Sequence, residues 1–256
     1  MKPRALILHA NGINRDLDVA QALELAGALP EIDHLNLLRQ RGTSWDAYQM
    51  LVVPGGFSYA DALGGGRLFA IDLMAYFSDQ VLRFIESGKP VIGICNGFQM
   101  LVKAGILPGR EGVHATLTFN SSGHFECRWV YLQPRSQKCL WTRGLMEMIY
   151  CPVAHGEGNF LFDQPTGADL LAENDEIALL YAREDGLLAE GVYPHNPNGS
   201  MRDIAGVCNP QGNVLGLMPH PENHIFSFQH PRWTRHQSGY LGLQLFQNGV
   251  NYACQN

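Results

Sequence analysis

The stretch Val-Ile-Gly-Ile-Cys-Asn-Gly-Phe-Gln at residues 91–99 decides the fold. Its first four residues predict a buried strand, and a helix is expected to follow through about Ala104. Gly93 and Gly97 let the backbone turn sharply around Cys95, as in a nucleophile elbow. A helix N-terminus at that place offers free N–H groups and a partial positive charge, which favour a thiolate nucleophile and an oxyanion. The alternative is a buried cysteine in an ordinary strand-to-helix turn.

Around this stretch, short apolar runs alternate with amphipathic ones, the pattern of a mostly parallel central sheet with helices on both faces. We expect strands at 5–9, 34–38 and 50–53, with helices at 16–28 and 68–85. From about residue 113, strands joined by turns indicate an added, partly antiparallel layer, with segments at 125–132, 148–153, 177–182, a hairpin at 207–218 and a final helix at 239–252. The fold class is therefore α/β, of the flavodoxin-like kind, and a single domain is expected over 1–256.

Composition excludes several classes of function. The 256 residues carry 18 Lys and Arg against 24 Asp and Glu. No cluster of Lys and Arg is dense enough to bind the phosphate backbone of a nucleic acid, so nucleic acid is not expected as a partner. The apolar run Ala5–Leu8 is too short for a signal peptide or membrane span, which predicts a cytoplasmic protein. The six cysteines never approach C-x-x-C spacing, so no metal site is expected.

A thiol nucleophile needs a base, and Leu217-Met-Pro-His-Pro-Glu222 supplies a candidate. Because His220 precedes a proline, it is expected to be extended, and positions two apart then point the same way. Glu222 could therefore fix the tautomer of the His220 ring while the other ring nitrogen faces a thiol. The alternative is a loop histidine among prolines.

A third signal is Pro54-Gly55-Gly56 after the strand at 50–53. Backbone N–H groups there would lie where neighbouring parallel strands end, which suits the second half of an oxyanion hole. The alternative is a plain strand-to-helix turn. The run at 64–66, Gly-Gly-Gly, lacks the Lys-Ser/Thr of a phosphate-binding loop.

Together these segments resemble the class I, or triad, glutamine amidotransferases. Further stretches narrow the resemblance to the glutaminase subunits of phosphoribosylformylglycinamidine synthase, which act in purine biosynthesis. They are GGFSYAD at 55–61, GICNGFQ at 93–99, LTFN at 117–120, FECRW at 125–129, PVAHGEG at 152–158, NPNGS at 196–200 and GLMPHPE at 216–222.

The resemblance implies a glutaminase that hydrolyses glutamine to glutamate and ammonia. Cys95 matches the nucleophile that forms a γ-glutamyl thioester, His220 the base and Glu222 its orienter. The backbone N–H groups of Gly56 and Asn96 match the oxyanion hole. The glutamine-binding residues implied are Gly55, Gln99, Asn120, His155, Gly156 and Glu157.

The resemblance also implies partners. Ammonia would pass to a large synthase subunit that binds ATP and Mg²⁺, with a small accessory subunit as a further partner, and no cofactor is expected in this chain. Two alternatives stay open: a triad enzyme serving another acceptor or acting as a cysteine hydrolase, and a silent docking module of the same fold.

Three segments depart from the pattern or admit two interpretations. Many family members have Gly where this chain has Ala60. The aromatic-rich stretch 225–237 is an ordered surface loop or a partner-binding edge. Residues 196–200 are a tight turn, to which the resemblance adds contact with the synthase.

Overall fold

The computed structural model describes residues 1–255. The fold is built around a nine-stranded sheet. Its strand order is β2-β1-β3-β4-β11-β10-β9-β6-β7. The strands are β1 (Arg4–His9), β2 (Leu29–His34), β3 (Met50–Val53), β4 (Val91–Ile94), β6 (Glu126–Pro134), β7 (Ile149–His155), β9 (Ile177–Ala182), β10 (Ile204–Cys208) and β11 (Val214–Leu217).

The sheet changes character at β11. Strands β2, β1, β3, β4 and β11 are parallel, whereas β11, β10, β9, β6 and β7 pair antiparallel. The antiparallel strands therefore extend the same sheet, and a separate two-stranded sheet joins β5 (Ala115–Thr118) to β8 (Asn159–Phe162). The predicted fold class is confirmed.

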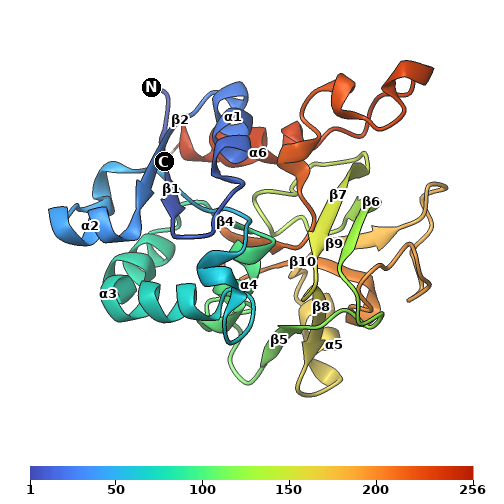
Figure 1. Ribbon diagram of the computed structural model, residues 1–256, viewed down its shortest axis with the longest axis horizontal. Helices are drawn as coiled ribbons and strands as arrows, with labels where there is room; N and C mark the ends of the chain where they lie inside the picture. Colours follow the sequence, from blue (N-terminus) through green and yellow to red (C-terminus); the bar gives the residue numbers. More distant parts are fainter. Residues whose placement is uncertain (256) are drawn as a thin grey trace.

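Helices cover both faces of the parallel half (Figure 1). The helices α1 (Asp16–Ala26) and α6 (Leu243–Ala253) pack together on one face, while α3 (Arg67–Glu86) and α4 (Asn96–Lys103) pack together on the other. The short helix α5 (Thr166–Glu173) lies near β8 (Figure 1) and buries Ala168 and Leu171. Burial on both faces explains why β1, β3 and β4 are almost wholly apolar.

The strand predicted at 34–38 is wrong. Strand β2 ends at His34, and the helix α2 (Leu35–Arg41) follows directly. The His34 side chain accepts a hydrogen bond from the Asn36 N–H at 3.1 Å and so caps the helix. Leu35 and Leu38 are buried, whereas Leu37 is exposed, so the apolar spacing is three residues and not two.

Three neighbouring parallel strands end at one edge of the sheet. Val53 of β3 pairs with Gly93 of β4, and Ile94 of β4 pairs with Leu217 of β11. Because these strands run the same way, the residues that follow them are brought side by side. Within residues 1–255, no helix is long and apolar enough to cross a membrane.

Between β3 and α3 the backbone makes an unusual left-handed turn. Tyr59, Ala60 and Asp61 have φ values of 52°, 56° and 51°. Residues with a β-carbon pay for this conformation, whereas glycine does not. A glycine at position 60 would therefore suit the turn better than alanine does.

We expect Ala60→Gly to stabilise the protein by about 0.5–1 kcal/mol, because relief of the left-handed strain outweighs the greater flexibility of glycine in the unfolded chain. Urea unfolding measures the change. Ala62→Gly is the matched control, since Ala62 has an ordinary φ of −56° and its replacement should not stabilise. Equal effects at the two positions would contradict the strain argument.

Candidate active site

Cys95 lies at the turn between β4 and α4, with φ 51° and ψ −106°. Its N–H donates to the Leu217 carbonyl at 2.8 Å, and its own carbonyl accepts from Gln99 at 3.0 Å. A β-carbon at position 97 would lie 1.9 Å from the Val53 carbonyl oxygen, so only glycine fits there. The turn is thus an elbow that β11, α4 and β3 hold in a strained conformation.

His220 and Glu222 form a buried pair beyond the end of β11. The Nδ1 atom of His220 lies 2.6 Å from Oε1 of Glu222, and both side chains are almost fully buried. Glu222 belongs to a single 3-10 turn, Pro221–Asn223, so the predicted extended alternation is not what brings the two together. The turn that Pro221 starts folds the carboxylate back onto the ring instead.

The Cys95 sulfur lies close enough to the His220 ring to interact with it electrostatically, and its thiol donates to the Ala154 carbonyl at 3.7 Å. Burial opposes protonation of the ring, but the charges of Glu222 and of the Cys95 sulfur outweigh it and raise the pKa of His220 to about 10. Within residues 1–255, Oε2 of Glu222 has no hydrogen-bond partner. The imidazolium is therefore what offsets this buried negative charge.

Two backbone N–H groups next to the sulfur are unused. The bridge between Ile13 and Gly56 is closed by hydrogen bonds from Phe57 to Gly12 and from Asn14 to Gly55, which leave the Gly56 N–H free. Asn96 is the first residue of α4 and has no intrahelical acceptor. Neither N–H donates a hydrogen bond within residues 1–255, so both are available to a ligand oxygen.

A small cavity of about 130 Å³ opens beside the sulfur. That volume is well below the roughly 300–1,000 Å³ of sites for drug-sized molecules, so the cavity suits a small metabolite. It is lined by Gly56, Phe57, Asp61, Cys95, Gln99, Phe119, Phe125, Ala154, His155, Gly156 and Glu157.

Two of the residues predicted to bind glutamine do not line this cavity. Asn120 is buried behind its wall, donating to the His155 carbonyl at 2.8 Å and accepting from the Gly158 N–H at 2.9 Å. Gly55 lies against both Cys95 and His220, since a β-carbon there would be 2.7 Å from Cε1 of His220 and 3.4 Å from Cβ of Cys95. Asn120 thus shapes the wall, and Gly55 gives the ring room.

His155 lies in the wall as a neutral ring. Its Nδ1 atom is 3.1 Å from Oδ1 of Asn120, an oxygen and therefore an acceptor, so Nδ1 carries the proton. Burial and the nearby charge of His220 lower the pKa of His155 to about 3. The stretch 196–200 supports the same wall, because the Ser200 hydroxyl donates to the Gly158 carbonyl at 3.1 Å.

A hydrogen-bonded network forms the cavity floor. The Asn96 amide accepts from the Ser58 N–H at 3.1 Å and donates to Oδ1 of Asp61 at 3.1 Å and to Oε1 of Gln99 at 2.9 Å. Gln99 in turn donates to the carbonyl of Glu157 at 2.7 Å. Each polar side chain of this network is therefore held in one orientation.

Sequence reasoning assigned no role to Asp61 or to the aromatic residues Phe57, Phe119 and Phe125. Asp61 was visible in the GGFSYAD segment, but nothing in its spacing indicates that the left-handed turn brings it to the cavity. Burial and the charge of Glu157 raise the pKa of Asp61 to about 6. The aromatic rings carry no sequence signal that separates them from core residues.

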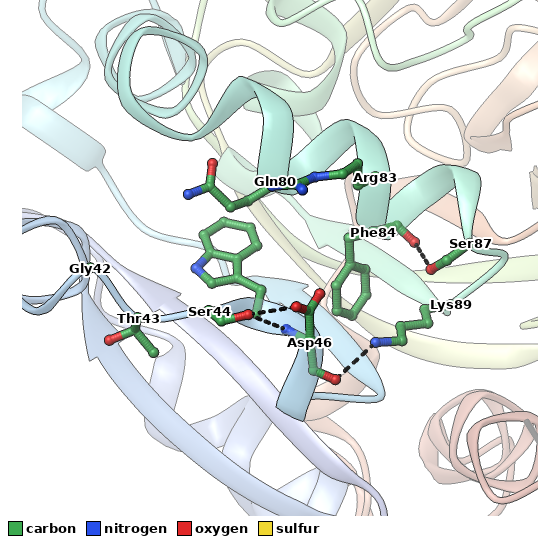
Figure 2. A pocket seen from close by; sticks show the side chains of 10 residues that line it. Gly42, Thr43, Ser44, Asp46, Gln80, Arg83, Phe84, Ser87 and Lys89 are labelled. Atoms are coloured by element: carbon green, nitrogen blue, oxygen red, sulfur yellow. Dashed lines mark hydrogen bonds between the residues drawn. The ribbon is translucent and has the colours of Figure 1, made fainter.

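A larger hollow of about 280 Å³ lies near the opposite ends of β3 and β4 (Figure 2). Its cations are already engaged: Lys89 donates to the carbonyls of Asp46 and Tyr48, and Arg83 to that of Asp79. Its lining holds no cysteine or histidine. Among residues 1–255, no cluster of three or more His, Cys, Asp or Glu side chains is placed to hold a metal ion.

The fold and the comparisons with known proteins place this chain among the glutamine amidotransferases. The solved structure of a glutamine amidotransferase from Thermotoga maritima has the same fold, with a TM-score of 0.55, 14% identity and all of both chains covered. The family model described as the CobB/CobQ-like glutamine amidotransferase domain matches residues 2–253. The chain belongs to this family.

More specific similarities point within the family. The chain is 53% identical to the phosphoribosylformylglycinamidine synthase subunit PurQ of Treponema denticola, covering 99% of this chain and 100% of that protein. It is 42% identical to the PurQ subunit of Dehalococcoides mccartyi, with 99% of each covered. It is also similar to a chain in the structure of PurLQS from Thermotoga maritima, with 33% identity, a TM-score of 0.76 and coverage of 98% and 99%.

Gly55→Ala is expected to lower glutaminase activity at least about 100-fold, because the added carbon displaces the His220 ring and a misplacement of about 1 Å costs that much. Glutamate release measures the loss. The φ of Gly55 is not in the left-handed region, so the backbone should tolerate alanine and the circular dichroism spectrum should not change. Activity within about threefold of the unmodified protein would show that the ring has space to move.

Glu222→Gln is expected to lower the pKa of His220, since the amide removes the charge that favours the imidazolium. A raised histidine pKa stabilises the folded state fully below the unfolded value of about 6.5, and this stabilisation is lost as pH rises toward the folded value. The substitution should therefore destabilise the protein more at about pH 6 than at about pH 9.5. Urea unfolding at both pH values measures this, and an equal loss would contradict a charged pair.

Proposed function

We propose that this chain is the glutaminase subunit of phosphoribosylformylglycinamidine synthase and hydrolyses glutamine through Cys95, His220 and Glu222. The observation that carries the proposal is the single edge of the sheet at which the sulfur, the imidazole and the carboxylate meet beside two unused N–H groups. Its substrate and assembly follow from similarity to the PurQ subunits over nearly the whole chain.

In the first half of the reaction, the Cys95 sulfur attacks the side-chain amide carbon of glutamine while its proton lies on His220. The amide oxygen becomes an oxyanion that the N–H groups of Gly56 and Asn96 stabilise. The carbon–nitrogen bond then breaks, and His220 gives its proton to the departing nitrogen. Ammonia leaves, and a γ-glutamyl thioester remains on Cys95.

In the second half, a water molecule attacks the thioester and His220 takes its proton. The carbon–sulfur bond breaks, glutamate leaves, and the proton returns to the sulfur. One glutamine and one water thus yield one glutamate and one ammonia. Glu222 keeps Nδ1 of His220 protonated throughout, so that the same ring nitrogen serves in both halves.

The ammonia then serves a large synthase subunit, which we propose binds ATP, Mg²⁺ and the ribonucleotide substrate. Three observations support this division of labour. The cavity beside Cys95 is small, the run at 64–66 lacks the Lys-Ser/Thr of a phosphate-binding loop, and a similar chain occurs in the PurLQS structure.

In the complex with the synthase, Cys95→Ala should abolish glutamine-dependent formation of phosphoribosylformylglycinamidine and leave ammonia-dependent formation intact. Removal of a nucleophile typically costs several orders of magnitude, whereas the acceptor reaction does not involve this sulfur. Product formation with each nitrogen source measures both. Cys254→Ala is the matched control, because Cys254 is exposed just after α6 and does not line the cavity.

Each contrary result identifies an alternative. Loss of both activities would make Cys95 a structural residue, and retention of both would make the chain a docking module. Glutaminase activity that the synthase does not raise would favour a triad enzyme for another acceptor. The same assay on the unmodified chain, with and without the synthase, separates these outcomes.

A further inference from the structure

The cavity beside Cys95 is electrostatically one-sided. Besides Cys95 and the neutral His155, its only ionisable lining residues are Asp61 and Glu157, and no Lys or Arg lines it. Glutamine carries one cation, its α-ammonium group, and one anion, its α-carboxylate. A cavity with two carboxylates therefore favours the ammonium end of the ligand.

The two carboxylates differ in what already binds them. Both oxygens of Glu157 accept from the Gly65 N–H at 3.2 Å, and Lys103 lies close enough to interact with the Glu157 charge. Asp61 accepts one hydrogen bond, on Oδ1 from Asn96. Within residues 1–255, no hydrogen bond reaches Oδ2 of Asp61 and no cation is among the groups that shift its pKa.

We propose that Asp61, assisted by Glu157, binds the α-ammonium group of glutamine and so selects α-amino acid amides over other amides. This assignment rests on the proposed glutaminase function and names a specificity residue that the Cys95–His220–Glu222 triad does not include. The Oδ2 atom of Asp61 is the free acceptor, and Oδ1 stays on Asn96. Asp61 thereby connects the substrate's amino group to Asn96, the residue that follows the nucleophile.

Physical reasons favour a cation at this position. Asp61 is about half-buried and lies near the negative charge of Glu157. Burial and this repulsion both disfavour the ionised form of Asp61. An ammonium group between the two carboxylates would relieve the repulsion and satisfy Oδ2. The buried Nε2 atom of His155, unpartnered within residues 1–255, belongs to the same wall and provides a further acceptor there.

The test compares two ligands that differ only in the α-amino group: L-glutamine and 5-amino-5-oxopentanoate. Binding is measured by calorimetry to full-length Cys95→Ala, which prevents turnover. Adding Asp61→Asn should weaken L-glutamine binding about 10- to 100-fold, the size of a charge-assisted hydrogen bond, and change binding of the analogue less than about threefold. Asparagine tolerates the left-handed backbone at position 61.

Two further variants sharpen the result. Asp79→Asn removes the same charge from the exposed face of α3 and should leave L-glutamine binding unchanged, which excludes a long-range effect of net charge. Asp61→Ser also removes the carboxylate charge. If that charge, and not the hydrogen bond to Asn96, binds the ammonium group, this variant should likewise weaken binding of L-glutamine and leave binding of the analogue nearly unchanged. Thermal unfolding of each variant verifies that it is folded.

The contrary outcomes are distinct. Equal weakening of both ligands would mean that Asp61 only positions Asn96, and no weakening would mean that the ammonium binds elsewhere; either result overturns the subsite alone. If Cys95→Ala binds neither ligand and the unmodified complex also uses no glutamine, the proposed function fails as well. In the active complex, Asp61→Asn should raise the KM for L-glutamine far more than it lowers kcat.

Discussion

The site depends on one constraint: three parallel strands that pair with one another must end at the same edge. The register of β3, β4 and β11 places residues 55–56, Cys95 and His220 side by side although more than a hundred residues separate some of them in sequence. Hydrogen bonds of the sheet fix this register, so a slip of β11 against β4 would separate the Cys95 sulfur from the His220 ring. The sheet's stability and the site's geometry therefore rest on the same hydrogen bonds.

That rigid edge also sustains local strain. Cys95 and the turn Tyr59–Asp61 hold positive φ values that cost free energy for residues with a β-carbon. In each case hydrogen bonds to well-packed neighbours oppose relaxation, through the Leu217 carbonyl at Cys95 and through the Asn96 amide at Asp61. Both strained positions aim a side chain into the same cavity. The strained turns thus place the side chains of Cys95 and Asp61 at the cavity, where an unstrained turn would not place them.

The sequence predicted what depends on local patterns and missed what depends on tertiary contact. The runs at 50–53 and 91–94 gave the exact bounds of β3 and β4, because buried parallel strands are continuously apolar. The strand predicted at 34–38 was wrong. The leucines at 35, 37 and 38 are compatible with the spacing of a strand or of a helix, and only tertiary packing determines which of them are buried. Strands β5 and β8 and helix α5 were not predicted. Asp61 reaches the site through the left-handed turn Tyr59–Asp61, and this turn contains no asparagine or glycine that would have indicated its conformation.

The two buried histidines near the sulfur show why partners and not residue type decide the chemistry. His155 contacts an amide, Asn120, and burial lowers its pKa to about 3, whereas His220 contacts a carboxylate, Glu222, and its pKa rises to about 10. The charge on His220 contributes to the lowering at His155, so one imidazolium excludes the other. In the proposed reaction this difference assigns proton transfer to His220 and leaves His155 as a neutral acceptor in the wall. The sequence contains both rings, but only the folded chain assigns them these opposite roles.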